Sequence, residues 1–282
     1  MRTFGGGTPL VNAAFHTQFN TINANVVGAF GAPIALAGFT EVRNAAAAVN
    51  AFSGAGAVGL PPATNLCAAL GVNYLTTVNC GSSALGYEEY VVLASNAPVY
   101  SIGRVSVSGF NPSELIHETF GALAPVLATG MHPNASGDYR SVVYMVADLG
   151  FPGMPRRVAA AFFHNVYVQD INRTFVMQRL PAIVQHILSN PALAGSQEVY
   201  LGGDFNVLPQ NRRSLPAYAM GTVAPAIWPG TTMGGTTIAG NLYDYWYANP
   251  VGGVVPNPVA FQFTMGGPAN NLSDHAGIGL LI

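Results

Sequence analysis

Lysine is absent from this chain of 282 residues, and all ten of its basic residues are arginine. Charge of both signs is scarce, since charged residues make up 8% of the sequence, against about 25% in an ordinary soluble domain. With a formal net charge of −2, the chain lacks the broad basic surface that holds nucleic acid non-specifically. This argues against a scaffold-type DNA-binding protein. It does not argue against an enzyme that grips one phosphate with a few arginines.

Two explanations of the missing lysine stay open. GC-rich coding favours arginine codons, whereas a toxin-type effector gains by avoiding lysine modification inside a host cell. The second gives a hypothesis in which the protein is secreted or delivered, with a partner or delivery subunit on its low-charge surface. The N-terminal residues MRTFGGGTPL contain no charged-then-apolar signal peptide, so secretion requires that a signal has been removed.

Cysteine is limited to Cys67 and Cys80. No Cys-x-x-Cys motif and no cluster of histidine with cysteine occurs, which argues against a zinc site. The two cysteines can form a disulfide bond in an oxidising compartment or remain as buried thiols, and the sequence leaves both alternatives open. Long apolar runs are also missing. Although hydrophobic residues make up 50% of the chain, every run is interrupted before the roughly 18 residues that span a bilayer, so an integral membrane protein is not predicted.

The hydrophobic pattern predicts more strands than helices. Helices are expected at residues 11–27 and 64–70, near residues 111–129 together with an irregular stretch, and at residues 172–189, the last of them kinked or interrupted at Pro181. Strands are expected at residues 33–42, 74–79, 87–95, 99–108, 140–149, 158–164, 198–205, 242–247, 259–263 and 277–282. Several strands are apolar on both faces, which is typical of two packed sheets with helices outside them. No repeat or linker divides the chain, so residues 1–282 are expected to form a single domain of the α/β (α+β) class.

A polar segment with the sequence Gly-Gly-Asp-Phe-Asn, residues 202–206, ends one of the apolar strands. Side chains alternate along a strand, so Asp204 and Asn206 place a carboxylate and a carboxamide on the same side of the strand end. There they can position a metal ion or a water molecule next to a phosphate. The competing interpretation is an ordinary turn, in which Asp and Asn are common.

A second polar segment, Ser273-Asp274-His275, precedes the last expected strand. A single histidine is more often structural than catalytic. However, Asp244 lies among aromatic residues on another expected strand, and a buried acid needs a partner. Histidine is a natural partner for it. The histidines at positions 16, 117, 132 and 186 are interpreted as structural or surface residues.

Taken in chain order, these motifs resemble a known superfamily. The order is Phe-Thr-Glu-Val-Arg at residues 39–43, Phe-Phe-His at 162–164, Gly-Asp-Phe-Asn at 203–206, Tyr-Asp-Tyr at 243–245 and Ser-Asp-His at 273–275. It is similar to that of the endonuclease/exonuclease/phosphatase superfamily, over essentially the whole chain. Arg-Thr-Phe-Gly at residues 2–5 and Glu-Val-Arg at 41–43 are most similar to DNase I-type endonucleases, and the nuclease subunit of cytolethal distending toxin belongs to the same superfamily. The resemblance implies a four-layer αββα sandwich of two packed mixed sheets flanked by helices. It also implies a divalent-metal-dependent phosphodiesterase whose substrate is DNA.

The resemblance further implies a role for each matching residue. The implied ligands of Mg²⁺, or of Ca²⁺ or Mn²⁺ in its place, are Glu41, Asp204, Asn206 and Asp274. The implied catalytic groups are His164 on the acid side, Glu88 behind it, and His275 as general base oriented by Asp244; Asp204 and Asn206 also hold water and phosphate. Arg2 and Arg43 are implied DNA contacts, and Arg140 is implied to hold a phosphate. Glu88 is preferred to Glu89 because it shares a strand face with Tyr90, a choice that a one-residue gap reverses.

Elementary chemistry agrees with these roles. Phosphodiester cleavage needs an activated water, a stabilised leaving oxygen and positive charge at the non-bridging oxygens. Histidine transfers protons near neutral pH, and a carboxylate behind it fixes its tautomer. Carboxylate and carboxamide oxygens favour Mg²⁺ or Ca²⁺ over softer metals.

The start of the chain departs from the family pattern. The family carries an Asn on its first strand just ahead of the Arg-Thr-Phe-Gly segment, and here that position would precede Met1. We therefore expect a first strand truncated at the N-terminus; the other interpretation is a weakened site. Two alternative functions stay open on the same scaffold. The high apolar content favours a phosphoinositide phosphatase or sphingomyelinase-type phosphoesterase, and the missing Asn favours a non-catalytic binding module.

Overall fold

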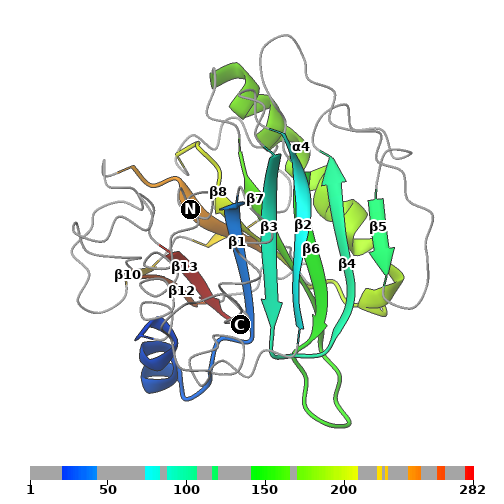
Figure 1. The fold of residues 1–282 in the computed structure, drawn as a ribbon, viewed down its shortest axis with the longest axis vertical. Coiled ribbons are helices and arrows are strands. Elements are labelled where there is room, and N and C mark those ends of the chain that lie inside the picture. Colours follow the sequence, from blue (N-terminus) through cyan, green and yellow to red (C-terminus); the bar gives the residue numbers. More distant parts are fainter. Residues whose placement is uncertain are drawn as a thin grey trace, which may run out of the picture.

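The structure, a computed structural model, describes eleven segments of the chain. They are residues 21–42, 74–82, 88–106, 116–119, 141–165, 170–208, 221–223, 226–227, 241–248, 259–263 and 277–282. Within them the chain forms thirteen strands in three sheets, together with helical segments (Figure 1). None of the helices in these segments has the length and apolar character needed to cross a membrane.

The largest sheet has seven strands in the order β5-β4-β6-β7-β8-β11-β9. Its strands are β4 (Val99–Ser106), β5 (Ile116–Thr119), β6 (Ser141–Asp148), β7 (Arg157–His164), β8 (Val199–Asp204), β9 (Gly221–Val223) and β11 (Asp244–Ala248). Only β7 and β8 run parallel to each other; the other neighbours are antiparallel. Nearly every residue of β6 and β7 is buried, because both faces of the sheet are covered. Both faces are therefore apolar, as the sequence predicted.

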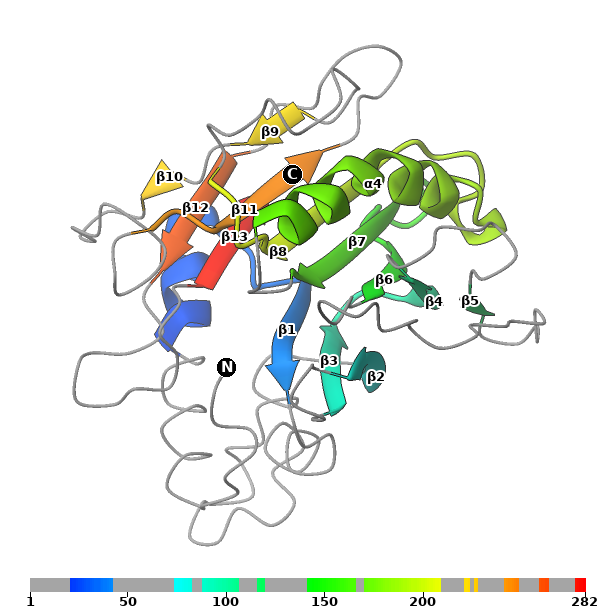
Figure 2. The ribbon, with the colours of Figure 1, turned by 90° about the horizontal axis from the view of Figure 1, so that it is seen from above.

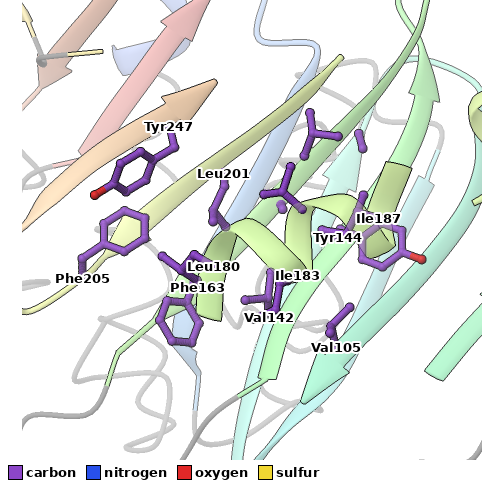
Figure 3. Packing of buried hydrophobic residues seen from close by; sticks show 14 of the residues in the cluster. Val105, Val142, Tyr144, Phe163, Leu180, Ile183, Ile187, Leu201, Phe205 and Tyr247 are labelled. Carbon is purple, nitrogen blue, oxygen red and sulfur yellow. The ribbon is translucent and has the colours of Figure 1, made fainter. Parts of the chain in front are cut away.

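One face of this sheet is covered by helix α4 (Asp170–Leu188), which connects β7 to β8 (Figures 2 and 3). Leu180, Ile183 and Ile187 of the helix pack against Val142 and Leu201 of the sheet. The helix is followed by a 3-10 helix, η3 (Pro191–Leu193), which is capped by Asn190.

Asn190 ties the end of α4 to the sheet. Its Oδ1 accepts a hydrogen bond from the N–H of Ala192 at 2.8 Å, and its Nδ2 donates to Ser101 Oγ and to the hydroxyl of Tyr144, both at 3.0 Å. Burial raises the pKa of Tyr144 to about 12, so its hydroxyl stays protonated and accepts this bond as a neutral group.

Two three-stranded sheets lie on the other face of the large sheet (Figure 2). One has the order β1-β3-β2 and is formed by β1 (Leu36–Val42), β3 (Glu88–Ser95) and β2 (Tyr74–Ser82). The other has the order β10-β12-β13 and is formed by β10 (Ala226–Ile227), β12 (Val259–Phe263) and β13 (Gly277–Leu281), with a helix at residues 21–30 beside it (Figures 1 and 2). Gly38 lets β1 approach β7, because a Cβ added there would lie 2.4 Å from the ring of Phe162. The result is the α+β sandwich of packed sheets that the sequence predicted.

Several predicted elements differ from the structure. The helix predicted at residues 111–129 is wrong at residues 116–119, which form the edge strand β5; its backbone pairs with β4, and this pairing outweighs the local helical pattern. The interruption predicted at Pro181 is also wrong, because α4 continues through it. A proline inside a helix costs about 3 kcal/mol, but buried side chains on both sides of Pro181 hold the helix to the sheet. The short strands β9 and β10 were not predicted, and residues 11–20 and 64–70 lie outside the described segments.

A candidate active site at the strand ends

Three neighbouring strands bring polar residues to one rim of the large sheet. In the parallel pair β7–β8, His164 lies opposite Asp204, and in the antiparallel pair β8–β11, Asp204 lies opposite Asp244. All three residues are buried, with 6% to 7% of their surface exposed. Sheet pairing therefore places side by side three residues that are separated by 40 positions or more in the sequence.

The imidazole of His164 lies between carboxylates from both packed sheets. Its Nδ1 is 3.3 Å from Oε2 of Glu89 on β3. Its Nε2 is 3.2 Å from Oε1 of Glu41 on β1 and 3.7 Å from Oδ2 of Asp204. Each ring nitrogen thus has an acceptor next to it, which fixes the plane of the ring.

Glu41 reaches this imidazole from an irregular position in β1. The pairing of β1 with β3 shifts register between Phe39 and Val42, and Glu41 has a φ of 59°. For a residue other than glycine this left-handed conformation costs about 1 kcal/mol. A bulge of this kind changes the direction of a side chain, and here it coincides with a carboxylate directed at His164. The local strain therefore supports a functional role for Glu41.

The end of β8 is held by buried hydrogen bonds, both within its own turn and to the residue that follows β7. The backbone N–H of Asn206 donates to Oδ1 of Asp204 at 2.8 Å, and the Nδ2 of Asn206 donates to Oδ2 of Asp204 at 3.1 Å and to the carbonyl of Asn165 at 3.0 Å. Asn165 in turn donates through Nδ2 to the carbonyl of Phe205 at 2.8 Å. The turn interpretation and the site interpretation of residues 202–206 are thus compatible, because this turn fixes the Asp204 carboxylate.

Asn165 did not stand out in the sequence. It is fully buried, and it links the end of β7 to the turn after β8. The available signal was its position directly after His164, at the end of an apolar strand. A polar residue there has to find hydrogen-bond partners once it is buried.

Glu89, rather than the predicted Glu88, contacts His164. Glu89 shares the inward face of β3 with Val91 and Leu93, which pack against the large sheet. The choice of Glu88 relied on the face of Tyr90, which is the other face of the strand. The side chain of Glu88 lies outside the described part of the structure.

Cys80 lies next to Glu89 as a buried thiol. Its Sγ donates to the backbone carbonyl of Glu89 at 3.1 Å. This corresponds to the buried-thiol alternative for that cysteine. Cys67 lies outside the described segments.

Five of the predicted site residues meet at this rim: Glu41, His164, Asp204, Asn206 and Asp244. Apart from Glu88, the remaining predicted residues are Arg2, Arg43, Arg140, Asp274 and His275, which lie outside the described segments, so the predicted pairing of Asp244 with His275 stays a prediction.

An aromatic layer lies beneath the acids. The rings of Phe205 and Tyr245 stack with their centroids 4.5 Å apart, and the Tyr245 hydroxyl donates to the carbonyl of Val207 at 2.9 Å. Burial, together with Tyr247 and the nearby charges of Asp204 and Asp244, raises the pKa of Tyr245 far above its ordinary value. Tyr245 is therefore a neutral structural group and not a general base.

The chemistry of the rim fits a hard divalent cation. Glu41 and Asp204 direct carboxylate oxygens at the same imidazole nitrogen, and Asp244 lies across the sheet from Asp204. The guanidinium groups with described side chains are engaged elsewhere: Arg104 with the carbonyl of Asn79, Arg156 with Glu198, and Arg157 with the carbonyl of Ala192. Oxygen ligands of this kind bind Mg²⁺ or Ca²⁺. No three acidic, histidine or cysteine side chains in the described segments are grouped as a metal cluster, so a cation held by Glu41 and Asp204 would need further ligands, such as Asn206 or the predicted Asp274.

Solved structures share this arrangement of sheets and helices. A mannosyl-6-phosphatase of Bacteroides thetaiotaomicron has a TM-score of 0.50 at 10% sequence identity, covering 95% of this chain and 92% of that chain. Truncated TDP2 of Caenorhabditis elegans has a TM-score of 0.50 at 13% identity, covering 95% of this chain and 91% of that chain. The chain has the endonuclease/exonuclease/phosphatase fold. A protein of that description from Bacteroides vulgatus has a TM-score of 0.48 at 13% identity, covering 93% of this chain and 90% of that chain.

At sequence identities of 10% to 13%, the similarity to these solved structures shows the fold alone. No protein-family model matches the sequence, and no curated protein matches it. A fold hosts many activities, so the chemistry of this chain rests on the residues gathered at the strand ends.

Proposed function

We propose that this protein is a divalent-metal-dependent phosphodiester hydrolase, and that it nicks DNA in the manner of DNase I-type endonucleases. The observation that carries the proposal is the buried imidazole of His164, held between Glu89 on one side and Glu41 and Asp204 on the other. A buried histidine flanked by carboxylates at the rim of a sheet is a typical arrangement for proton transfer.

The two sides of the His164 ring have different roles in this proposal. Glu89 faces Nδ1 and orients the ring, as second partners of catalytic histidines do. Nε2 faces the rim that Glu41 and Asp204 share, and there it donates a proton to the leaving oxygen of the phosphodiester.

The remaining roles are assigned to acids of the rim and to predicted residues outside the described segments. Glu41, Asp204 and Asn206 would hold Mg²⁺, and Asp274 would add a further ligand. When bound, the ion stabilises negative charge on the phosphate oxygens. His275, oriented by Asp244, would take the proton from the attacking water. Arg2, Arg43 and Arg140 would contact the DNA phosphates.

A phosphomonoesterase on the same residues is the second candidate. A solved structure with a TM-score of 0.50 is a mannosyl-6-phosphatase. Its reaction differs from nicking in the leaving group and in the room that the substrate needs.

A plasmid-nicking assay tests the proposal. The wild-type protein should convert supercoiled plasmid to open circles with Mg²⁺ and stop when the metal is chelated. His164→Ala should lower the nicking rate by a factor of about 10² to 10⁴, the usual contribution of a general acid. His186→Ala is the matched control, because His186 lies on α4 and away from the rim. It should nick at the wild-type rate.

Release of phosphate from mannose 6-phosphate, measured beside nicking, separates the two candidates. Phosphate release without nicking would favour the phosphomonoesterase. Nicking that survives both chelation and His164→Ala would refute the proposed site.

A further inference from the structure

The turn between β6 and β7 carries the two most exposed large apolar side chains of the described segments. Phe151 is 81% exposed and Met154 is 74% exposed. The whole run Phe-Pro-Gly-Met-Pro, residues 151–155, is exposed and contains no polar side chain. We refer to residues 151–155 as the hairpin tip. Figure 1 shows the hairpin projecting from the lower end of the sheets, so these apolar residues lie on a convex surface.

The hairpin tip has a defined turn geometry. Gly153 has a φ of 86°, and the N–H of Met154 donates to the carbonyl of Phe151 at 2.9 Å. Pro152 followed by a glycine of positive φ is typical of a type II turn. Phe151 and Met154 form an antiparallel bridge, so their side chains point to the same side of the hairpin. The two side chains therefore form a single apolar wedge.

The backbone of the hairpin needs few hydrogen bonds from water. Oδ1 of Asp148 accepts from the N–H groups of Gly150 at 2.9 Å and Arg156 at 2.8 Å. Leu149 and Met154 donate to backbone carbonyls within the hairpin, and the two prolines of the tip have no N–H. Most N–H groups between Asp148 and Arg156 are thus bonded or absent. Since an unpaired backbone group is costly in hydrocarbon, this arrangement favours transfer of the tip out of water.

The charged side chains behind the tip form two pairs. Nη2 of Arg156 lies 2.6 Å from Oε2 of Glu198, and Nε of Arg157 lies 4.0 Å from Oδ2 of Asp148. The guanidinium of Arg157 also lies 3.4 Å from the ring centre of Tyr100, which is 38% exposed. The charges of the two pairs cancel. Tyrosine and arginine are common where an apolar surface meets water, as at the headgroup level of a membrane.

A lipid surface fits these features better than a protein partner does. A specific protein interface takes about 20–30 residues from each side, whereas the exposed apolar tip is short and convex. A bilayer accepts a small apolar wedge without a matching pocket. Arg156 follows Met154 by two residues, about 6–7 Å along the strand. This spacing corresponds to the depth of about 5–10 Å to which interfacial elements are buried.

We propose that the hairpin tip inserts into the surface of a zwitterionic lipid bilayer. Phe151 and Met154 enter the boundary of the acyl chains, and the paired charges stay among the headgroups. One short anchor of this kind gives weak, reversible binding. β7 runs from the hairpin to His164, about 23 Å at 3.3 Å per residue, so the candidate active site lies at the end of the sheet away from the bilayer. A protein bound in this way takes its substrate from solution and not from the headgroups.

Cosedimentation with vesicles tests the proposal without any reference to hydrolysis. The probes are vesicles of phosphatidylcholine alone and of phosphatidylcholine mixed with phosphatidylserine. The wild-type protein should bind the first at least as tightly as the second, and added salt should not weaken binding, because the charges near the tip are paired. Phe151→Trp places a fluorescent reporter in the tip. Its emission should shift to the blue and be quenched by lipids brominated in their acyl chains.

Three variants show which side chains are responsible. Phe151→Ser combined with Met154→Ser should weaken vesicle binding by about tenfold or more, because both lose apolar surface that the bilayer buries. Val27→Ser is the matched control, since Val27 is also exposed but lies on the helix at residues 21–30; it should bind like the wild-type protein. Glu198→Gln leaves the charge of Arg156 unpaired. It should strengthen binding to the phosphatidylserine vesicles by about fivefold and leave binding to phosphatidylcholine unchanged.

Circular dichroism checks that the variants are folded. The proposal is overturned if the wild-type protein binds neither kind of vesicle, if its binding requires phosphatidylserine, or if the double substitution at the tip has no larger effect than Val27→Ser. A protein partner would give a different result. Self-association in analytical ultracentrifugation that the double substitution abolishes, without vesicle binding, would assign the tip to a second copy of the chain and would also overturn the proposal.

Discussion

At the scale of single residues, the contact between Glu89 and His164 is important because both side chains are buried. Glu89 is 3% exposed, and its Oε2 lies 3.3 Å from Nδ1 of the imidazole. Breaking a buried pair by removing one partner costs about 3–5 kcal/mol. Rotation of the imidazole ring away from Glu89 is therefore energetically unfavourable. Nε2 is thereby held toward Glu41 and Asp204.

Glu89→Gln tests this orientation, since it removes the charge and keeps the shape of the side chain. We expect kcat for DNA nicking to fall by a factor of about 10 to 100, the range for partners that orient a site group. KM should stay nearly unchanged, because Glu89 does not face the rim. Glu88→Gln is the adjacent control and should retain most of the activity. The opposite ranking of the two variants would restore the assignment of Glu88.

The sequence located most of this cluster, and the misses have a physical cause. Asp204 stood out as a polar residue at the end of an apolar strand, whereas Glu41 and His164 were found through the resemblance in the order of the motifs. Glu89 and Glu88 could not be told apart, because the choice depends on which face of β3 points inward. Asn165 was missed because a buried asparagine is identified only by its tertiary hydrogen bonds.

At the scale of elements, the central strands were predictable because their sequences are apolar on both faces. β6, β7 and β8 lie within a residue or two of the predicted bounds. β5 and the unbroken course of α4 through Pro181 were not predictable, because distant partners decide them: β4 pairs with β5, and the large sheet holds α4. Local preference is a weak guide where tertiary contacts compete with it.

Gly203 makes the close pairing of β7 and β8 at the rim possible. It has a φ of 147°, and a Cβ added there would lie 1.9 Å from the carbonyl oxygen of Phe163. Gly203→Ala should therefore lower the free energy of unfolding by about 3 kcal/mol or more, as severe steric conflicts in a core do. Gly195→Ala is the control, since Gly195 also has a positive φ, of 84°, but nothing lies within 4 Å of the added Cβ.

Gly195→Ala should lower the free energy of unfolding by only about 1 kcal/mol, which is the cost of the left-handed backbone conformation alone. Urea unfolding of both variants measures the difference. Similar losses in the two variants would show that the backbone angle, and not the contact with β7, requires glycine at position 203.

The pair formed by Arg156 and Glu198 links the β6–β7 turn to the segment before β8, and it should make stability depend on acid pH. Two hydrogen bonds, at 3.0 and 2.6 Å, join the two side chains. Burial acts to raise the pKa of Glu198, but the hydrogen bond and charge of Arg156 and the bond from Tyr200 outweigh it and hold the pKa below the ordinary 4.5. A carboxyl group whose pKa is lowered in the folded state stabilises the protein at pH values above its ordinary pKa. This contribution is lost as the pH falls through the pKa of the folded state.

Glu198→Gln should therefore reduce the free energy of unfolding at pH 7 by about 1 kcal/mol, the upper range for a solvent-exposed ion pair. The difference from the wild-type protein should shrink as the pH is lowered below 4.5. Urea unfolding at pH 7 and pH 3 measures it. A difference that is constant across this range would mean that the charge of Glu198 does not stabilise the fold.

At the scale of the whole molecule, the scarcity of charge limits how DNA can be held. A net charge of −2 and ten arginines do not provide a long basic track, and three of those arginines are engaged within the described structure. The proposed contacts from Arg2, Arg43 and Arg140 would neutralise only a small number of DNA phosphates. Binding should therefore be local, and its salt dependence should be shallow.

The salt dependence of DNA binding measures this number directly. Each neutralised phosphate contributes about −0.9 to the slope of log K against log salt, so three contacts predict a slope of about −3. The measurement uses the His164→Ala variant to prevent cleavage. Arg43→Ala should make the slope shallower by about 1, whereas Arg156→Ala should leave it unchanged, because Arg156 is paired with Glu198. A slope near zero would mean that these arginines do not contact phosphates, and the preference for DNA over smaller phosphoesters would lose its support.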